Sequence, residues 1–267
     1  MRGSSDTVQS EMKHLFSPEG AAALIATMAR RPLLAFDFDG TLAPIEARPE
    51  DARVSQAVAV RLDRLAAILP LAIISGRRVE DVRTRLAFEP RYIIGNHGAE
   101  DSFALAQIDR SSLFDGLRKR LRAYAVELGA LRVMVEDKGQ SFALHYRLAH
   151  DPDQALGLIT KLLVGLDPGL NVFGGKMVVN VVAAASSDKA DALVRLMKKS
   201  GVDSAVFVGD DLNDEPVFAR ARATWLTVRV GRDDPMSRAT YCLDNFGEVA
   251  TMLDRMLAVL DSPQARD

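Results

Sequence analysis

The sequence predicts an α/β protein, a doubly wound parallel sheet with a smaller α+β domain inserted into it. Three features lead to this class: short apolar runs, helical stretches that alternate with them, and a middle region of different rhythm. The chain has 267 residues, of which 48% are hydrophobic and 26% charged. This is ample apolar material for a packed core, and the length exceeds the commonest domain size.

Four short, continuous apolar runs predict the strands of the sheet. They cover 33–36, 71–74, 92–94 and 205–208. Such runs are typical of strands that are buried on both faces. Helical patterns lie between them, as a doubly wound sheet requires, over 56–67, 79–86 and 189–199. Near the start of the chain, the apolar stretch 21–29 is too short to span a bilayer, and we expect a helix capped by Ser17.

The middle of the chain predicts a separate domain with an αββαββ order. Two helices, over 111–128 and 153–164, each precede a pair of strands. The strand pairs are 132–137 with 141–147, joined at Lys138-Gly139, and 170–173 with 176–182, joined at Gly174-Gly175. Antiparallel hairpins of this kind suit a sheet with one polar face. We therefore expect a core formed by 1–102 and 184–267, and an inserted cap formed by 103–183.

Composition excludes several functional classes. The 34 Lys and Arg residues nearly balance 36 Asp and Glu, which gives a formal net charge of -2, so we expect no nucleic-acid partner. Cys242 is the only cysteine, which excludes an internal disulfide and a metal cage of thiolates. We also expect no membrane association and a cytoplasmic location. The sequence leaves the oligomeric state open.

Polar residues follow each predicted strand. The first strand is followed by Asp37-Phe38-Asp39, the second by Ser75-Gly76-Arg77, the third by Gly95-Asn96-His97, and the fourth by Asp210-Asp211 with Asp214 nearby. The carboxyl ends of parallel strands meet at one edge of the sheet, where ligands bind. A single aspartate there is equally well explained as a helix cap or a turn former. The joint pattern crowds up to five carboxylates, which calls for a cation, and oxygen ligands suit Mg²⁺.

Lys189 strengthens the expectation of a phosphate site. It falls at the start of a predicted helix, where its charge opposes the helix macrodipole. A phosphoryl group nearby would explain that position. The alternative is an ordinary solvated lysine at a helix that begins elsewhere.

These motifs together resemble the haloacid dehalogenase superfamily. Asp37-Phe38-Asp39-Gly40-Thr41, Ser75-Gly76-Arg77, Lys189 and Gly209-Asp210-Asp211-Leu212-Asn213-Asp214 match its four motifs in order. Within the superfamily, the chain resembles trehalose-6-phosphate phosphatases through Gly95-Asn96-His97-Gly98, the run from Val135 to Arg147, and Gly175-Lys176. The resemblance covers most of the chain, from about Leu33 to Phe218.

The resemblance implies a role for each core residue. Asp37 would attack phosphorus and form an aspartyl phosphate, and Asp39 would act as general acid and then general base. Mg²⁺ would be held by the Asp37 carboxylate, the Asp39 backbone carbonyl and Asp210. Asp214, with Asp211 as a further candidate, would orient metal-bound water. The residues that would hold the phosphoryl oxygens are Ser75, Gly76 and Lys189.

The cap would supply the contacts to the sugar. Ser141, His145 and Arg147 alternate along one predicted strand and share its polar face, although such a face could equally lie in water. To these the resemblance adds Glu136, Lys138, Lys176 and Asn180. Lys176 and Asn180 are expected on one strand, facing the same way. His97 is ranked low, because a loop histidine with satisfied hydrogen bonds explains it as well.

The resemblance and the motifs imply a Mg²⁺-dependent phosphatase acting on a small sugar phosphate, trehalose 6-phosphate first. Relatives usually carry Glu where Asn180 stands, and Lys-Gly where Lys189-Ala190 stands. Asn180 therefore keeps a phosphatase for another mannosyl or glucosyl phosphate as an alternative. A phosphomutase shares the core motifs, and a sugar-phosphate sensor without turnover would not need Asp39. An ion-pumping ATPase is excluded, because the chain has no membrane spans and such pumps lack an acid at that position.

Overall fold

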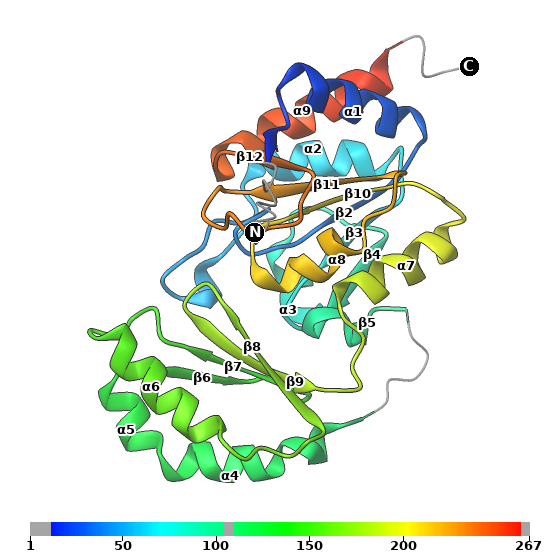
Figure 1. The fold of residues 1–267 in the computed structure, drawn as a ribbon. Coiled ribbons are helices and arrows are strands. Elements are labelled where there is room, and N and C mark those ends of the chain that lie inside the picture. Colours follow the sequence, from blue (N-terminus) through cyan, green and yellow to red (C-terminus); the bar gives the residue numbers. More distant parts are fainter. Residues whose placement is uncertain (1–11, 104–108, 263–267) are drawn as a thin grey trace, which may run out of the picture.

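The computed structural model describes residues 12–103 and 109–262, and these form two sheets with helices packed on them (Figure 1). The larger sheet has the strand order β1-β12-β11-β10-β2-β3-β4-β5, and the smaller has β6-β7-β9-β8. The strands of the larger sheet are β1 (Lys13–His14), β2 (Leu33–Phe36), β3 (Leu71–Ile74), β4 (Tyr92–Gly95), β5 (Glu100–Asp101), β10 (Ala205–Gly209), β11 (Trp225–Val230) and β12 (Tyr241–Leu243). Those of the smaller are β6 (Met134–Asp137), β7 (Ser141–His145), β8 (Leu170–Gly175) and β9 (Val178–Ala183).

Helices and short 3-10 turns connect these strands. The α-helices are α1 (Pro18–Ala29), α2 (Gln56–Ala66), α3 (Val79–Arg85), α4 (Asp115–Ala123), α5 (Ala125–Ala130), α6 (Pro152–Leu163), α7 (Lys189–Ser200), α8 (Glu215–Ala219) and α9 (Val249–Asp261). The 3-10 turns are η1 (Pro49–Asp51), η2 (Asn96–Gly98), η3 (Ser111–Phe114), η4 (Leu212–Asp214) and η5 (Phe246–Glu248). Ser17 caps α1 by accepting a hydrogen bond from the Gly20 amide, as predicted.

The larger sheet has helices on both faces, which confirms the predicted fold class. Its strand pairs are parallel except for the short edge strand β5, which runs antiparallel to β4. One face packs against α1, α2 and α9 (Figure 1). Leu24, Leu62 and Met252 of these helices belong to the same buried cluster as Phe36 of β2. The other face packs against α7 and α8, for example through Leu193. Because both faces are covered, the carboxyl ends of the strands are the natural place for a site.

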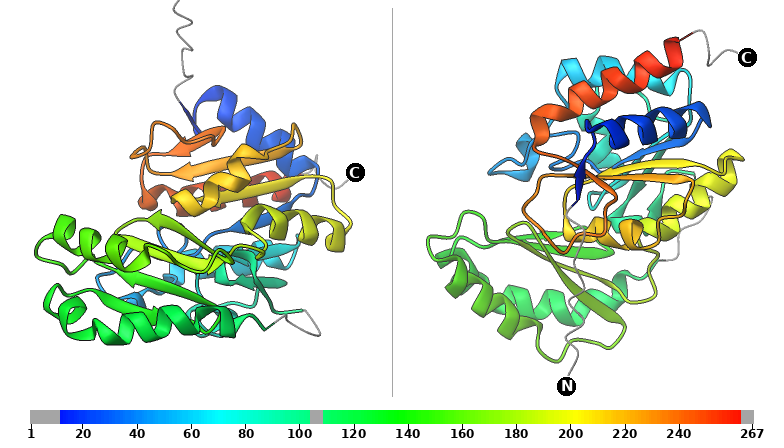
Figure 2. Two further views of the ribbon diagram at one scale, coloured as in Figure 1. Left: turned by 60° about the horizontal axis from the view of Figure 1, so that its bottom comes forward. Right: turned by 45° about the horizontal axis from the view of Figure 1, so that its top comes forward.

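The smaller sheet is antiparallel, and its elements follow the predicted αββαββ order, except that the single helix predicted over 111–128 is divided into η3, α4 and α5. Its helices α4, α5 and α6 cover the face that points away from the larger sheet (Figures 1 and 2). Between that face and the helices lies a separate core with Phe114, Phe142 and Ile159 at its centre. The opposite face of this sheet is directed at the carboxyl ends of β2 and β10, where it meets Asp37 and Asp210.

Two details of the smaller sheet differ from the prediction. The turn between β8 and β9 falls at Lys176-Met177, and the expected turn at Gly174-Gly175 is wrong, because both glycines continue β8 and pair with β9. Met177 takes the positive φ of 60° that this tight turn requires. The strand β7 ends at His145, so Arg147 lies beyond it and does not continue its alternation.

The sequence patterns missed four strands of the larger sheet, β1, β5, β11 and β12, and two helices that pack on it, α8 and α9. Thr227 and Arg229 alternate with apolar residues in β11 and interrupt its apolar character, so it does not form a continuous apolar run like the predicted strands. All six residues of β11 are nevertheless buried.

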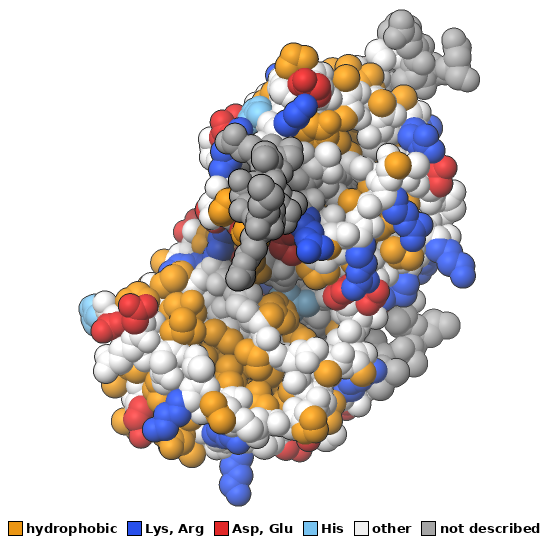
Figure 3. All heavy atoms as spheres, viewed as in Figure 1, with side chains coloured by type: hydrophobic (Ala, Val, Ile, Leu, Met, Phe, Trp, Pro, Cys, Tyr) orange, Lys and Arg blue, Asp and Glu red, His pale blue; other side chains and the backbone are white. Residues whose placement is uncertain are grey.

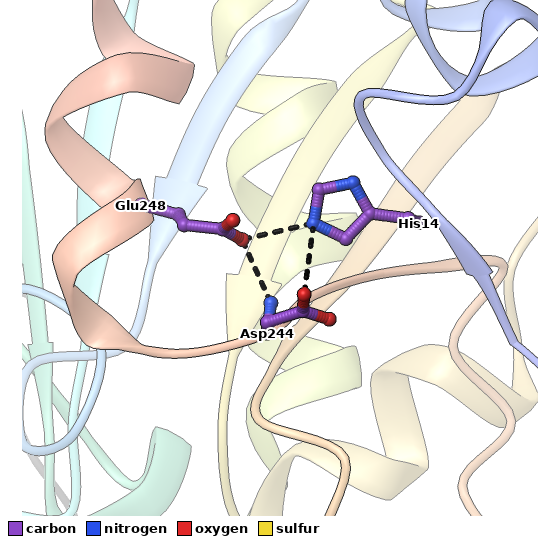
Figure 4. A group of neighbouring side chains, drawn as sticks. All are labelled: His14, Asp244 and Glu248. Carbon is purple, nitrogen blue, oxygen red and sulfur yellow. Dashed lines mark hydrogen bonds and ion pairs between the residues drawn. The ribbon is translucent and has the colours of Figure 1, made fainter.

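The edge strand β1 is held in place by a small polar cluster formed by His14, Asp244 and Glu248 (Figure 4). The His14 Nδ1 accepts a hydrogen bond from the Phe16 amide at 3.1 Å, which places the ring proton on Nε2. Nε2 then donates to the Glu248 carboxylate at 2.9 Å, and Glu248 also accepts from the Asp244 amide at 2.8 Å. With this tautomer His14 offers no lone pair to a metal ion. We therefore interpret the cluster as a set of structural hydrogen bonds that holds β1 to η5 and to the residue after β12.

The face seen in Figure 3 carries both signs of charge. Lys and Arg side chains are interspersed with Asp and Glu side chains over the larger sheet's layer. Among the helices of the described residues, none has the length and apolar character needed to cross a membrane.

Candidate active site

A cavity of about 100 Å³ lies where the ends of β2 and β10 meet the polar face of the smaller sheet. Both layers contribute charged side chains to it. From the larger sheet's layer come Asp37, Asp39, Gly76, Arg77, His97, Asp210, Asp211 and Asn213. From the smaller sheet and the turns beside it come Glu136, Lys138, Ala143, His145, Arg147, Lys176, Val178 and Asn180.

Asp37 is the first residue after β2, and its carboxylate is buried beside a lysine. Lys189 Nζ lies 3.0 Å from Asp37 Oδ1 and 2.7 Å from Asp214 Oδ1, and Lys189 is only 1% exposed. Burial raises the pKa of Asp37 well above its usual range, against the attraction of Lys189. Conversely, Asp214 and Asp37 raise the pKa of Lys189 although burial opposes them. The lysine is therefore a fixed positive charge between two carboxylates.

Asp210 closes the other side of the carboxylate group. It follows β10, its Oδ1 accepts from Thr41 at 3.2 Å, and its Oδ2 lies 2.8 Å from Lys176 Nζ. Burial raises its pKa to about 7, with Asp214 adding to the shift and Lys176 opposing it. Gly40, at a φ of +80°, backs directly onto this carboxylate, because a Cβ there would lie 2.1 Å from Asp210 Oδ2. Only glycine fits at this position.

Three carboxylates of this group could hold a cation. Asp37, Asp210 and Asp214 each offer an oxygen, and these oxygens lie within 4.8 Å of one another. All the donors are oxygens, which suits a hard ion of the Mg²⁺ type. Burial is the main cause of the raised pKa of Asp37 and Asp210, and the neighbouring carboxylates add to it, so a bound cation would stabilise the charged form of both.

Asp39 points away from this group and into an arginine fork. Its two oxygens accept from Arg77 at 2.7 Å each. Arg77 also donates to Asp81 at 2.8 Å and to the Pro49 carbonyl at 2.7 Å. A bidentate pair of this kind fixes the plane of the carboxylate as well as its position. Sequence analysis did not list Arg77 as a site residue, although its place in Ser75-Gly76-Arg77 beside so many acids was a usable signal.

Ser75 and Gly76 form the turn after β3, and the turn is tightly held. The Ser75 hydroxyl is fully buried and accepts from the Arg77 amide at 3.1 Å. The Gly76 carbonyl accepts from Lys138 Nζ of the smaller sheet at 2.8 Å. Gly76 lines the cavity, whereas Ser75 lies behind it.

The polar residues of β6 and β7 form a connected group. His145 Nε2 lies 3.1 Å from Glu136 Oε2, and Lys138 Nζ lies 3.7 Å from the same oxygen. Burial lowers the pKa of Lys138, and Glu136 opposes the shift. The Ser141 hydroxyl does not reach the cavity but donates to Asn96 Oδ1 at 2.8 Å. Ser141 therefore joins the two sheets in this structure.

The remaining predicted residues come from β9 and the neighbouring loops. Asn180 lies on β9 and is 3% exposed, whereas Lys176 lies in the turn before it, so the expected single strand for the two is wrong. Both still line the cavity. Arg147 donates to the carbonyls of Glu46 and Lys176, and the latter bond is 3.0 Å long. Lys176 also lies 3.4 Å from Asp233, a residue that sequence analysis missed.

The family model for trehalose-phosphatase matches residues 35–240. A trehalose-phosphate phosphatase of Mycobacterium avium is 29% identical over 248 residues, which cover 87% of this chain and 63% of that protein. An uncharacterized glycosyl hydrolase of Mycobacterium tuberculosis is 31% identical over 255 residues, 89% of this chain but 19% of that protein. The chain therefore spans about a fifth of the latter protein and under two thirds of the former.

Solved structures share the fold. The C-terminal domain of the Candida albicans trehalose-6-phosphate phosphatase superposes with a TM-score of 0.78 at 21% identity, covering 94% of this chain and 99% of that one. A haloalkanoate-superfamily phosphatase from Bacteroides thetaiotaomicron superposes with a TM-score of 0.59 at 18% identity, covering 85% and 95%. At these identities the likeness concerns the arrangement of the sheets and helices.

Proposed function

Because the chain belongs to the trehalose-phosphatase family, we propose that it hydrolyses a sugar phosphate monoester, with trehalose 6-phosphate as the preferred substrate. The single observation that carries this proposal is the position of Asp37. Its carboxylate lies at the end of β2, beside a buried lysine and at the wall of a cavity whose opposite wall is polar. A phosphoryl group in that cavity would meet a nucleophile and a positive charge together.

In the proposed first half-reaction, an Asp37 oxygen attacks phosphorus and the bond between phosphorus and the sugar oxygen breaks. Asp39 gives a proton to that sugar oxygen, so the sugar leaves as a neutral alcohol. To do so, Asp39 has to be protonated and has to free one oxygen from the Arg77 fork. Ser75, the Gly76 amide and Lys189 are the proposed partners of the phosphoryl oxygens.

In the second half-reaction, a water molecule attacks the aspartyl phosphate and Asp39 takes its proton. The bond between phosphorus and Asp37 breaks, so both carboxylates return to their starting state. Asp37, Asp210 and the Asp39 backbone carbonyl are the proposed ligands of Mg²⁺, supported by Asp214 and Asp211. When bound, the ion would neutralise charge on the nucleophile and on the phosphoryl group.

We also propose that residues 103–183 act as a movable cap on a core formed by 1–102 and 184–267. The cavity of about 100 Å³ is smaller than the roughly 300 Å³ or more that ligand pockets usually need. A disaccharide phosphate would therefore require the cap to open and to close again over a larger space. Glu136, Lys138, His145, Arg147 and Lys176 are the proposed sugar-binding residues. Ser141 and Asn180, which the sequence also predicted for this role, lie where the smaller sheet meets the turn η2.

The direct test is phosphate release from a panel of sugar phosphates, with and without Mg²⁺. We expect the highest catalytic efficiency for trehalose 6-phosphate and no release in excess chelator. A higher efficiency for a mannosyl or glucosyl phosphate would favour the second candidate, which the presence of Asn180 supports. Binding of the sugar phosphates without any release would indicate a sensor.

Mg²⁺ is expected to stabilise the protein more at about pH 8 than at about pH 6. The pKa of Asp210 is raised to about 7, so below that pH a proton competes with the cation, and the apparent affinity should fall up to about tenfold per pH unit. Without the metal, the pH dependence of folding stability has the opposite sign. A carboxyl group whose pKa is raised in the folded state stabilises the protein below about pH 4, and this stabilisation is lost as the pH rises toward 7.

The measurement is the melting temperature at both pH values, taken without Mg²⁺, with subsaturating Mg²⁺ and with saturating Mg²⁺. The metal-free melts supply the baseline for each pH. An equal effect of subsaturating Mg²⁺ at the two pH values would show that Asp210 is not a ligand.

The substitution His145→Ala is expected to impair trehalose 6-phosphate hydrolysis selectively. His145 is held by Glu136 on the cavity wall of the smaller sheet, where only a sugar would reach it. We expect catalytic efficiency to fall roughly tenfold for the sugar phosphate, as for the loss of one hydrogen bond to a charged pair, and to stay within about twofold for p-nitrophenyl phosphate. The matched control is His150→Ala, on the exposed surface of the same cap. Equal losses on both substrates would make the role of His145 structural.

A further inference from the structure

The turn η2 connects the candidate phosphate-binding turn to the smaller sheet. Its backbone is tied to that turn on both sides, because the Asn96 amide donates to the Arg77 carbonyl at 2.7 Å and the His97 amide to the Ser75 carbonyl at 3.0 Å. Asn96 and His97 have φ values of +47° and +59°. Two consecutive non-glycine residues in this region are costly and persist only where the surroundings hold them.

The His97 ring lies directly on Gly76. A Cβ at Gly76 would come within 2.4 Å of the His97 Cε1 atom, so residue 76 has to be glycine for the imidazole to fit. Gly76 is also the residue whose amide we propose as a phosphate ligand. Any displacement of this ring would therefore be felt at the proposed phosphate site.

The other side of the same ring meets the smaller sheet. Phe173 of β8 packs edge-on against it, with ring centroids 5.0 Å apart and an interplanar angle of 89°. Asn180 of β9 lies directly opposite Phe173 in the sheet, and a hydrogen bond with its side chain raises the pKa of the imidazole. Next to it, Ser141 of β7 donates to Asn96. Three strands of the smaller sheet thus dock onto this one turn.

The charge state of His97 explains why an amide suits position 180. Burial, together with Lys138 and Lys189, holds the pKa of His97 well below its usual range, so the ring is neutral near pH 7. Nδ1 has no hydrogen-bond partner, and the hydrogen bond with Asn180 raises the pKa against burial, as expected where an amide oxygen accepts from a ring N–H. A glutamate here would instead raise the pKa of the ring and favour a second proton on it, against the effect of the two lysines.

We propose that His97 is a positioning residue that transmits docking of the cap to the phosphate-binding turn, and that Asn180 is its docking partner on the cap. This inference rests on the proposed function, in which the cap closes over the core when the sugar phosphate is bound. It gives Asn180 a role other than a contact to the sugar. The ring of His97 contacts Gly76 on one side and lies against Phe173 and Asn180 on the other, so it links the cap to the phosphate-binding turn.

The test is a double-substitution cycle with the variants His97→Phe, Asn180→Leu, and the two combined. Each single substitution leaves a buried polar partner unsatisfied, which is costly. Replacing both partners with apolar groups of similar shape can be nearly neutral. Phenylalanine also keeps the ring contacts with Gly76 and Phe173.

We expect each single variant to lose roughly tenfold in catalytic efficiency for trehalose 6-phosphate, mostly through KM, and the double variant to recover to within about threefold of wild type. For p-nitrophenyl phosphate, which does not need the closed cap, all three should stay within about threefold. The matched control is His145→Phe, whose partner Glu136 lies within the cap; Asn180→Leu should not rescue it.

A second measurement does not depend on turnover. Spin labels at Val126→Cys and Val60→Cys, which are 84% and 49% exposed on the cap and the core, report the distance between the two layers, and the native Cys242 is buried. The single variants should shift the distribution to longer distances, and the double variant should restore it. A double variant as impaired as Asn180→Leu, with an unchanged distance distribution, would assign Asn180 to the sugar and overturn the proposal. An altered distribution with no phosphatase activity in the wild type would reject the proposed function alone.

Discussion

Replacing Asp37 with asparagine is expected to reduce phosphate release by at least about a thousandfold for every phosphate monoester. The amide is nearly isosteric but is too weak a nucleophile to form an acyl phosphate, and single substitutions of nucleophiles have effects of this size or larger. The fold should survive, because burial already raises the pKa of Asp37 and disfavours its charge, while Lys189 keeps Asp214 as a partner. We expect a change in unfolding free energy within about 1 kcal/mol.

The measurement combines phosphate release with rapid acid quenching, which should trap phosphoprotein in the wild type and none in Asp37→Asn. The matched control is Asp39→Asn, the same substitution two residues further on. It should also be severely impaired on trehalose 6-phosphate, but less so on p-nitrophenyl phosphate, whose leaving group needs little protonation. Activity of Asp37→Asn within about tenfold of wild type would remove Asp37 from the role of nucleophile.

The core of the site was predictable because parallel strands impose it. Four buried runs, each followed by polar residues, place Asp37, Ser75, Asn96 and Asp210 at one edge of the sheet whatever the details of packing. The structure has strands at 33–36 and 71–74 as predicted, and the other two differ by one residue. Lys189 likewise begins α7. Local pattern and tertiary structure agree here, since every residue of these strands is buried.

The hairpin between β8 and β9 was not predictable from turn residues. Gly174 and Gly175 look like a turn, yet both pair with β9, opposite Val179 and Val178. The register of the sheet decides where the chain reverses, and Met177 supplies the left-handed residue. Propensity for a turn was therefore overridden by strand pairing. The consequence is local: Lys176 moves from strand to turn and reaches Asp210.

His97 was underestimated for a different reason. Nothing within its own segment separates a satisfied loop histidine from a buried one that contacts Gly76 and Asn180. Those contacts join residues far apart in the sequence, and they exist only when the two sheets meet. Arg77 shows the same limit, because its fork to Asp39 depends on how the turns after β2 and β3 face each other.

Replacing Lys189 with methionine is expected to destabilise the protein by about 3–5 kcal/mol near neutral pH and to abolish activity. Lys189 is 1% exposed, and its ammonium lies within 3.0 Å of Asp37 and Asp214. Removing one partner of a buried ionic group leaves the other charges uncompensated. The matched control is Lys198→Met, an exposed lysine on the same helix, which should change stability by no more than about 0.5 kcal/mol.

The destabilisation caused by Lys189→Met should depend on pH. Without Lys189 the pKa of Asp37, already raised by burial, should rise further, so the folded variant binds a proton that the unfolded chain releases above about pH 4. The destabilisation should therefore be larger near pH 8 than near pH 5. Denaturant unfolding at both pH values measures this difference.

If the single variant does not fold, the double variant Lys189→Met/Asp214→Asn should restore folding, because one carboxylate is removed. It should not restore activity, because the proposed phosphate ligand is still missing. A destabilisation independent of pH, or a double variant no more stable than the single, would mean that Lys189 acts through packing and not through charge.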